Sequence, residues 1–566
     1  HQDEFYTTGT FTGLTILGSR VQSLGTGTIA LYGKGGNGGT GSDFAYSGFT
    51  NPSTNGVRLD GGTVIASSHP SSSDFTVSIV GVGGLGASDS VGVVIANPDT
   101  IVSAASGALL IEGFGGGQST GQRNRGVLFT GGHIQATNLA NITLYGAGGS
   151  GVNENDGIQL NSGARISAAN GDMILDGYAG ETLGIGVMLG NTAGNLSITG
   201  TGTVTVQGEG TNADGIVLGN AGAFVGGTNA GFVELQSTGD LRVQRELLAS
   251  GGIFLNASAG GTIVDGEIHS TNGNIAIEGD DVTINAEVTA DDGNIEIIFG
   301  DQPLIGESEP EVEAATFNGT AAINDLLTAS GWVRYYGGDG GGDLLTFAGY
   351  TASGVDLDFG TLFDVEQVVG SGSSDDRLTG PSVASTYSFT GADVFQVGGV
   401  DFSAFENVLG GPANDTFAFS GSATLSGSLD GGGGTNTLDY TSYGTGVIID
   451  LENGAATGII GGFENIATFT GSGNIDTITG PGSASTYTFT GPDAMQVGSV
   501  SVSGFENVIA GPLEDEFVFL PGSRISGTLD GGSSPTPVAN RLNYAGYGAP
   551  VTVHLGTAAL SATGIA

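Results

Sequence analysis

Four short glycine-rich phrases in the second half of the chain contain an aspartate that is followed closely by an apolar residue. They are GSGSSDDRL, GGPANDTF, GSGNIDTI and AGPLEDEF, with Asp376, Asp415, Asp476 and Asp515 as their aspartates. A carboxylate is a hard oxygen ligand, so the chemistry these residues could supply is calcium binding. Calcium takes about six to eight oxygens, more than one short turn provides. The copies are 39 to 61 residues apart, so each phrase offers one or two ligands unless coiling of the chain stacks the turns.

The phrases resemble the calcium-binding nonapeptides of RTX proteins, G-G-x-G-x-D-x-hydrophobic-x, which occur in tandem. The resemblance implies calcium at these four aspartates, held by carboxylates and backbone carbonyls of neighbouring turns. The alternative is structural: an Asp after Gly closes a turn by bonding local backbone, and the next apolar residue begins a buried strand. We expect the turn first and calcium second, with no cofactor required for the fold.

The remaining titratable residues are not arranged for catalysis. The five histidines are scattered singly, and no Ser, His and Asp arrangement is evident. A polysaccharide-cleaving β-helix would need acidic residues at one position of adjacent coils. Aligning GNIAIEGDD with GNIEIIFGD places Ala276 beside Glu296 and Glu278 beside Ile298, so no acidic ladder forms. We therefore predict no catalytic and no cofactor-binding residues, and a protein that is not an enzyme.

Aromatic residues recur at fixed places in the second half. Phe405, Phe463 and Phe505 open FEN phrases, and Tyr387 and Tyr487 lie in STYSF and STYTF. Repetition at one place in every unit predicts stacked ladders that stiffen a repeat protein. The alternative is an exposed strip of Tyr that binds carbohydrate.

The composition excludes several kinds of partner. The chain has 566 residues, 109 glycines, no Cys and a formal charge of −45. That charge repels nucleic acid and anionic membrane surfaces and favours divalent counter-ions. No stretch approaches the roughly 20 apolar residues of a membrane helix, so we expect no membrane insertion. Without Cys, stability must come from packing and backbone hydrogen bonds.

A short phrase of glycine followed by alternating apolar residues recurs through the first half. It begins at Gly56, Gly92, Gly126, Gly157, Gly186 and Gly215, with spacings of 36, 34, 31, 29 and 29 residues. Between the phrases lie a second run, such as ARISA at 164–168, and a third, such as NITLYGAGG at 141–149. Each run alternates apolar and polar residues, the period of a strand with one buried face. Three short strands per unit predict one coil of a β-solenoid with parallel sheets.

From residue 252 the unit shortens to about 20 residues, with GNIAI at 273 and GNIEI at 293. Coils of this length with Gly-Asn-Ile-x-Ile resemble the right-handed β-helix of filamentous-haemagglutinin-type proteins. The wider units, such as GVRLDGGTVIASS and GDMILDGYAG, are similar to Gly-rich β-strand-repeat surface proteins of cyanobacteria and planctomycetes, including giant adhesins. We expect an all-β chain: a right-handed parallel β-helix (β-solenoid) followed by a second β-repeat array.

Three segments are expected. Residues 1–300 form a β-helix of about 20–36-residue coils, and 301–332 an acidic junction with a short helix in AAINDLLTAS. Residues 333–566 form a β-rich array of 100-residue repeats, 363–462 and 463–566, whose first parts align without gaps. The last echo stops in mid-phrase, which suggests a section of a longer array or an end that meets a neighbouring subunit.

These expectations favour an extracellular, cell-surface protein with a structural or adhesive role in a fibre, filament or giant adhesin. The alternative function is a carbohydrate-binding or carbohydrate-cleaving β-helix. The expected partners are the chain itself, by end-to-end or lateral assembly, or neighbouring repeats of a longer chain. Surface carbohydrate is a further candidate partner.

Overall fold

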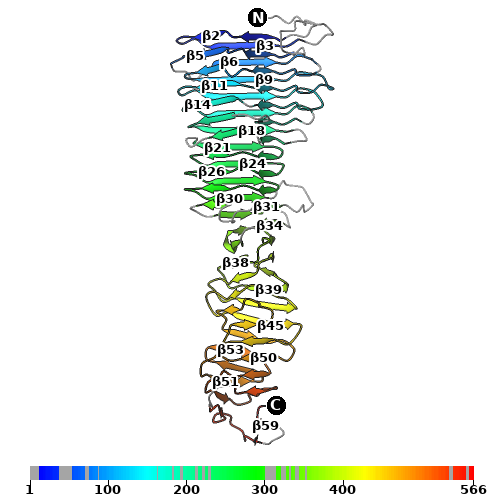
Figure 1. Cartoon of the computed structure of the whole chain (residues 1–566), viewed down its shortest axis with the longest axis vertical. Coiled ribbons are helices and arrows are strands. Elements are labelled where there is room, and N and C mark those ends of the chain that lie inside the picture. The colour runs from blue at the N-terminus through cyan, green and yellow to red at the C-terminus, as the bar shows by residue number, and fades with distance from the viewer. Residues whose placement is uncertain are drawn as a thin grey trace. The chain divides into compact units, whose positions relative to one another are not determined.

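In the computed structural model, the regular secondary structure of the described residues is almost wholly β-strand (Figure 1). The structure describes residues 12–36, 54–70, 75–86, 88–161, 163–181, 184–190, 196–210, 214–219, 223–226, 231–299, 314–319, 327–329, 333–337, 343–350, 354–533, 539–555 and 560–565. In this part of the chain the only helix is the 3-10 turn η1 (Phe359–Thr361), and no helix is long and apolar enough to cross a membrane. The chain divides into two compact units, His1–Gly319 with Asn324–Asp343, and Thr320–Ile323 with Leu344–Ala566.

The first unit is a parallel β-helix whose described residues form eleven coils of three strands. Sheet A consists of β1 (Leu14–Leu17), β4 (Val57–Asp60), β7 (Val93–Ile95), β10 (Val127–Phe129), β13 (Ile158–Leu160), β16 (Val187–Leu189), β19 (Ile216–Leu218), β22 (Leu241–Val243), β25 (Thr262–Val264), β28 (Val282–Ile284) and β31 (Ala314–Gly319). Sheet B consists of β2 (Arg20–Ser23), β5 (Val64–Ser67), β8 (Ile101–Ala104), β11 (Gly132–Ala136), β14 (Ala164–Ala168), β17 (Leu196–Gly200), β20 (Ala223–Gly226), β23 (Leu247–Ala249), β26 (Ile268–Ser270), β29 (Val288–Ala290) and β32 (Leu327–Ala329). Sheet C consists of β3 (Ile29–Lys34), β6 (Phe75–Val82), β9 (Ala108–Phe114), β12 (Asn141–Ala147), β15 (Met173–Tyr178), β18 (Thr203–Glu209), β21 (Phe232–Ser237), β24 (Ile253–Ala257), β27 (Ile275–Gly279), β30 (Ile295–Phe299) and β33 (Val333–Tyr336).

The core of the first unit consists of apolar columns that run from coil to coil. Alternate residues of each strand are buried, as the period-2 pattern predicts. The clearest column lies on the inner face of sheet C, where every member is fully buried and paired in register with the next: Ile79, Ile111, Leu144, Leu175, Val206, Leu235, Leu255, Ile277 and Ile297. Identical positions therefore stack on one another, and the predicted parallel β-helix is confirmed.

Pairs of glycines close the corner at which sheet C of one coil meets sheet A of the next. Gly146 on β12 lies so near the chain before β13 that a Cβ would overlap the carbonyl oxygen of Gly157. The same contact recurs along the unit, at Gly33 with Gly56, Gly81 with Gly92, Gly113 with Gly126, Gly177 with Gly186, and Gly208 with Gly215. The recurring glycine of the sequence is therefore explained by close backbone approach.

Two boundaries differ from the sequence-based prediction. The coils continue past residue 300, because β31 pairs with β28, β32 with β29, and β33 with β30. β33 belongs to sheet C, so the β-helix extends past residue 332, where the sequence-based prediction ends the junction and begins the second array. The helix expected in 321–330 lies mostly outside the described residues, and the described part, β32, is a strand. Parallel pairing to the preceding coil favours the extended backbone there over local helix propensity.

The second unit is also a stack of coils, with one long sheet and a second row of short strands. The long sheet pairs, in this order, β34 (Leu344–Tyr350), β37 (Gln367–Val369), β41 (Val400–Ser403), β40 (Val394–Val397), β39 (Thr386–Gly391), β43 (Thr416–Gly421), β45 (Thr437–Tyr443), β49 (Thr468–Thr470), β53 (Val500–Ser503), β52 (Ala494–Val497), β51 (Thr486–Gly491), β55 (Glu516–Phe519) and β57 (Arg541–Asn543). The short strands are β35 (Asp356–Asp358), β38 (Arg377–Thr379), β42 (Asn407–Leu409), β44 (Leu429–Asp430) and β48 (Phe463–Glu464), and then β47 (Ala455–Ala456), β46 (Ile448–Asp450), β50 (Thr477–Thr479), β54 (Asn507–Ile509) and β56 (Leu529–Asp530). β36 (Leu362–Phe363) and the pair β58 (Val553–Leu555) and β59 (Leu560–Ala562) complete the unit. Pairing in the long sheet is parallel except at β40 and β52, each the middle strand of a meander.

The sequence repeat of the second unit is also a repeat of its strands, but the structure corrects the predicted alignment at one place. β38 to β42 recur 100 residues later as β50 to β54, but β37 recurs 101 residues later as β49. The loop before Asp476 is one residue shorter than that before Asp376, because the bonded serine is four residues away in one and five in the other. The gap-free alignment of this stretch was therefore wrong by one residue.

Aromatic rings fill the core of the second unit, as predicted. Tyr387 and Tyr487 are fully buried, so they are not an exposed carbohydrate-binding strip. Tyr387 stacks on Phe417 with ring centroids 4.7 Å apart, and Phe389 stacks on Phe419 at 4.2 Å. The stack recurs in the second repeat, with Phe489 and Phe519 at 4.4 Å.

We expect Gly146→Ala to destabilise the coils around it, because its Cβ would overlap the Gly157 carbonyl. Overpacking of this kind costs about 1–3 kcal/mol of unfolding free energy. Thermal unfolding by circular dichroism, with hydrogen exchange of peptides from residues 141–160, measures the loss. Gly473→Ala is the matched control, since a Cβ there meets nothing within 4 Å. Equal stability of the two variants would contradict the glycine-contact argument.

Candidate functional site

The four aspartates predicted as calcium ligands are all buried at turns that precede strands. Asp376 precedes β38 and Asp476 precedes β50, whereas Asp415 precedes β43 and Asp515 precedes β55. Two of them therefore begin short strands and two begin strands of the long sheet. The structure does not bring the four carboxylates together into one site.

Asp376 and Asp476 make equivalent contacts. The Asp376 carboxylate accepts N–H bonds from Ser371 in its own loop, at 2.8 Å, and from Val355 in the preceding coil, at 2.6 Å. The Asp376 N–H donates to the Glu406 carboxylate of the next coil, at 3.0 Å. Asp476 repeats this pattern with Ser472, Val447 and Glu506.

Asp415 and Asp515 make a related set. Asp415 accepts from the N–H of Gly411 in its own loop, at 2.9 Å, and from the N–H of Ser385, at 2.8 Å. Its own N–H donates to the side-chain oxygen of Asn436, at 2.9 Å. Asp515 accepts from Ser485 and donates to Asn540, and its second carboxylate oxygen, Oδ2, is buried without a hydrogen-bond partner among the described residues.

Three of the aspartates, Asp376, Asp415 and Asp476, thus connect their own turn to the coil before and the coil after, the contacts that the turn interpretation predicts. Asp515 bonds to the neighbouring coils through Ser485 and Asn540, but its carboxylate accepts no N–H of its own turn among the described residues. Sequence reasoning missed the acceptors on the following coil, which are Glu406, Glu506, Asn436 and Asn540. The repeated FEN phrase carried a signal for the two glutamates. Within the described residues no group of three His, Asp or Glu side chains is placed to hold a metal ion. Calcium binding at the four aspartates stays a prediction.

Burial dominates the electrostatics of these turns. Loss of hydration raises the pKa of Asp376, Asp415 and Asp515, and the N–H groups that they accept oppose this shift. The pKa of Glu406 is also raised, by burial and by the nearby Asp376 charge. The hydroxyl of Tyr387 lies beneath Gly380, and burial together with the Asp415 charge raises its pKa. These buried groups are therefore part of the packed interior of the coil stack.

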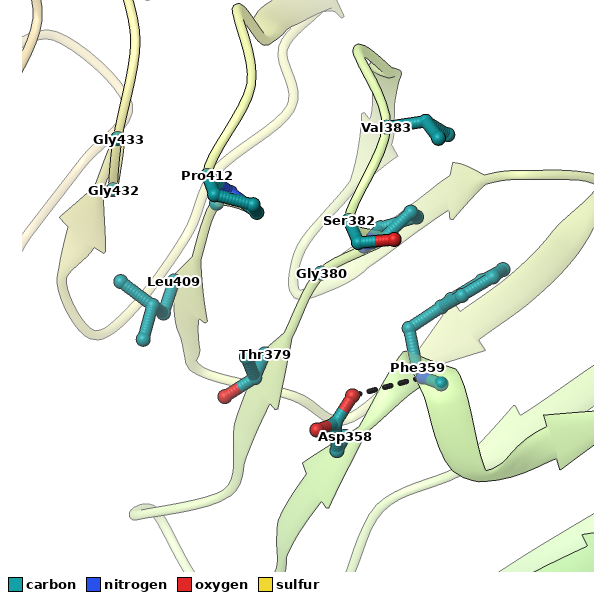
Figure 2. A pocket seen from close by; sticks show the side chains of 14 residues that line it. Asp358, Phe359, Thr379, Gly380, Ser382, Val383, Leu409, Pro412, Gly432 and Gly433 are labelled. Atoms are coloured by element: carbon teal, nitrogen blue, oxygen red, sulfur yellow. Dashed lines mark hydrogen bonds between the residues drawn. The ribbon is translucent and has the colours of Figure 1, made fainter.

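A groove of about 640 Å³ runs across the loops that follow β35, β38, β42 and β44. Figure 2 shows the side chain of Phe359 beside the loop that carries Ser382 and Val383. Asp358 accepts the N–H of Gly360 at 2.8 Å, so this carboxylate is engaged in starting η1. The rest of the lining is mainly glycine and proline backbone with aliphatic side chains. This lining contains no pair of groups suited to acid–base or nucleophilic chemistry.

One Ser–His contact lies on the outer face of sheet B. The ring Nε2 of His133 is 2.7 Å from the hydroxyl of Ser167 on the next coil. Burial and the nearby Arg165 charge lower the pKa of His133. Among the described residues no carboxylate bonds to this histidine, so the orienting third member of a catalytic triad is not present there.

Partly exposed aromatic residues gather on the outer face of sheet C. We call Phe114, Tyr145 and Tyr178, on β9, β12 and β15, the aromatic strip. The Tyr145 ring centroid lies 5.7 Å from that of Phe114 and 5.5 Å from that of Tyr178. Sequence reasoning missed this strip because its members stand in three different phrases and meet only once the register of the coils is known.

The fold defines the chain as a parallel β-helix repeat protein. No family model, no curated protein and no solved structure matches it.

We expect Asp376→Ala to lower the free energy of unfolding by about 2 kcal/mol or more, because it leaves buried N–H groups without acceptors and each costs about 1–3 kcal/mol. Chemical denaturation followed by circular dichroism measures the effect. Asp375→Ala is the matched control, because Asp375 is the exposed neighbour.

The Asp376→Ala variant, together with Asp415→Ala, also tests the calcium prediction. The turn interpretation predicts nearly the same unfolding midpoint in calcium, magnesium and chelator. A midpoint that rises in calcium alone, and no longer rises in Asp376→Ala and Asp415→Ala, would contradict it and establish metal sites.

Stability should decrease as the pH rises through the weakly acidic range. The carboxyl groups with clear pKa shifts among the described residues are all shifted upward: Asp156, Asp176, Glu278, Asp376, Glu406, Asp415 and Asp515. The folded chain holds these protons more tightly than the unfolded chain. The free energy of unfolding therefore falls as the pH rises from the ordinary pKa values of these carboxyl groups to their raised pKa values. We expect a higher thermal midpoint at about pH 5 than at about pH 8. A lower midpoint at the acidic end would show that the carboxylates stabilise the fold when charged.

Proposed function

We propose that the chain is an extracellular structural and adhesive protein, a component of a surface fibre, filament or giant adhesin. The observation that supports this role is the unbroken register of eleven coils, in which backbone ladders and apolar columns repeat from one coil to the next. Such a stack has no isolated weak layer, because each coil is held by both of its neighbours.

Charge supports the same role. A formal charge of −45 keeps such chains soluble and repels nucleic acid, and divalent cations can bridge acidic surfaces. We propose that the partners are other copies of the chain or neighbouring repeats of a longer chain. The glycine-rich loops that leave the coils after sheet C supply surface for contacts.

A carbohydrate-binding role is the second candidate, and the aromatic strip is the observation that favours it. It fits within the adhesive role, because an adhesin needs a ligand and a stiff scaffold that presents the binding face. Carbohydrate cleavage is not proposed, since the described carboxylates do not form pairs on adjacent coils of one outer column of sheet C.

We expect antibodies against this chain to label the surface of intact, unpermeabilised native cells in immunogold electron microscopy. Negative-stain images of the purified chain should show end-to-end or lateral association that increases with calcium or magnesium and reverses with chelator. Label confined to the cell interior would exclude the surface role. Isolated particles under every ionic condition would exclude self-assembly and leave only the longer-chain alternative.

A further inference from the structure

The outer face of sheet C presents one continuous column of side chains. Register pairing places one member on each coil, in this order: Tyr32, Val80, Glu112, Tyr145, Asp176, Gln207, Gln236, Asn256, Glu278, Ile298 and Tyr336. The seven from Glu112 to Glu278 all carry polar groups. Neighbouring strands lie about 4.8 Å apart, so the column offers a hydrogen-bonding group at that interval along the axis of the first unit.

Within this column one aromatic ring stands between two carboxylates, and a second ring lies in the neighbouring column. Tyr145 is paired in register with Glu112 on one side and Asp176 on the other. Tyr178 is paired with Glu209 on the next coil, and is 37% exposed. Partial burial, and after it the Asp176 and Glu112 charges, raise the pKa of Tyr145. The rings therefore stand in a field of negative charge, next to several hydrogen-bond acceptors.

The polar members farther along are connected to one another. The Gln207 amide donates to the Gln236 side-chain oxygen at 3.0 Å, and Gln236 donates to Glu234 at 2.6 Å. Asn256 donates to the Glu278 carboxylate at 2.5 Å. These bonds hold the side chains in fixed orientations, which lowers the entropic cost of binding a ligand along them.

From this arrangement we propose that the aromatic strip, together with the polar members of the column from Glu112 to Glu278, binds an uncharged polysaccharide aligned with the axis of the first unit. A sugar unit has an apolar C–H face, which an aromatic ring covers, and hydroxyl groups around its edge, which donate to carboxylates and amide oxygens. Both kinds of group are present on the neighbouring coils of β9, β12 and β15. A repeating ligand matches a repeating protein surface, since each sugar unit meets an equivalent strand position.

Charge decides which polysaccharide the strip accepts. Glu112, Asp176 and Glu209 surround the rings, and the whole chain is strongly acidic. A uronic-acid or sulfated chain would be repelled, whereas an uncharged chain of hexoses only donates and accepts hydrogen bonds.

The geometry favours binding over cleavage. Glu112 and Asp176 are two coils apart, about 9.6 Å, at or beyond the upper end of the carboxylate separation of inverting glycosidases. Tyr145 lies between them, where the sugar bond and the attacking water would have to stand. We therefore assign the strip no hydrolytic step.

This inference deepens the adhesive part of the proposed function, and its test is separate from that of surface location and assembly. Native gel electrophoresis of the full chain would be run with hydroxyethyl cellulose, laminarin or dextran in the gel, and with alginate as the anionic comparison. The variants are Tyr145→Ala, Tyr178→Ala and both together. Tyr32→Ala is the matched control, because Tyr32 is exposed in the same column but lies outside the aromatic strip.

We expect at least one uncharged polysaccharide to retard the wild-type chain and alginate to leave it unaffected. Each single Tyr→Ala change should weaken the apparent Kd about tenfold, with little change for Tyr32→Ala. Tyr145→Phe should retain most of the retardation, because the ring is kept. Circular dichroism of every variant confirms that the coils are intact.

Three results would overturn the proposal. The first is no retardation of the wild-type chain by any of the uncharged polysaccharides. The second is an equal loss of retardation in Tyr32→Ala and Tyr145→Ala. The third is retardation by alginate only, and only when calcium is present. The last result would indicate ion bridging by the acidic surface. None of these three results bears on surface labelling or assembly of the chain. The fibre proposal is therefore tested separately, by the labelling and imaging experiments.

Discussion

Close contact between backbones at one corner of the coil is the constraint on which the first unit depends. Among the described residues, six glycines of sheet C lie in register from Gly33 to Gly208, and each touches the glycine that precedes the next strand of sheet A. A side chain at either member would separate the two sheets. Because successive side chains of a strand alternate between faces, fixing this one position fixes which residues of the strand point inward.

The glycine column ends at Ser237, which is paired in register with Gly208. The Ser237 hydroxyl donates to the carbonyl of Gly239 at 2.6 Å. At this coil a side-chain hydrogen bond therefore replaces the close contact between glycines at the corner. The following coils are also the shorter ones, about 20 residues each, as the spacing of β24, β27 and β30 shows. In the second unit, buried aspartates fill the corresponding structural role, since the carboxylates of Asp376, Asp415 and Asp476 each accept backbone N–H groups from their own turn and from a neighbouring coil. Backbone contact and buried carboxylates are thus two ways to close a turn of a parallel stack.

Local pattern was sufficient to predict the strands and much of their pairing. The run ARISA at 164–168 coincides with β14, and Ala276 pairs with Glu296 and Glu278 with Ile298, as aligned from the sequence. The sequence could not reveal what depends on distant coils. The one-residue shift before Asp476 emerges from the strand positions and from its bond to Ser472. The acceptor role of Glu406 emerges from its place one coil after Asp376. The strand nature of Leu327–Ala329 likewise follows from pairing with β29, which local propensity does not contain.

The two faces of sheet C are under different constraints. Inward residues such as Leu144 and Leu175 are fully buried, so the volume of each is limited by the coils above and below. Outward residues at the same strands, such as Tyr145 and Asp176, are only partly buried and are less limited in volume. Their strand is already held by its backbone ladder and by the glycine corner. A binding surface on this face can therefore vary without loss of the fold. That separation is why the aromatic strip, rather than the buried aspartates, is the part of this chain in which ligand specificity is expected to lie.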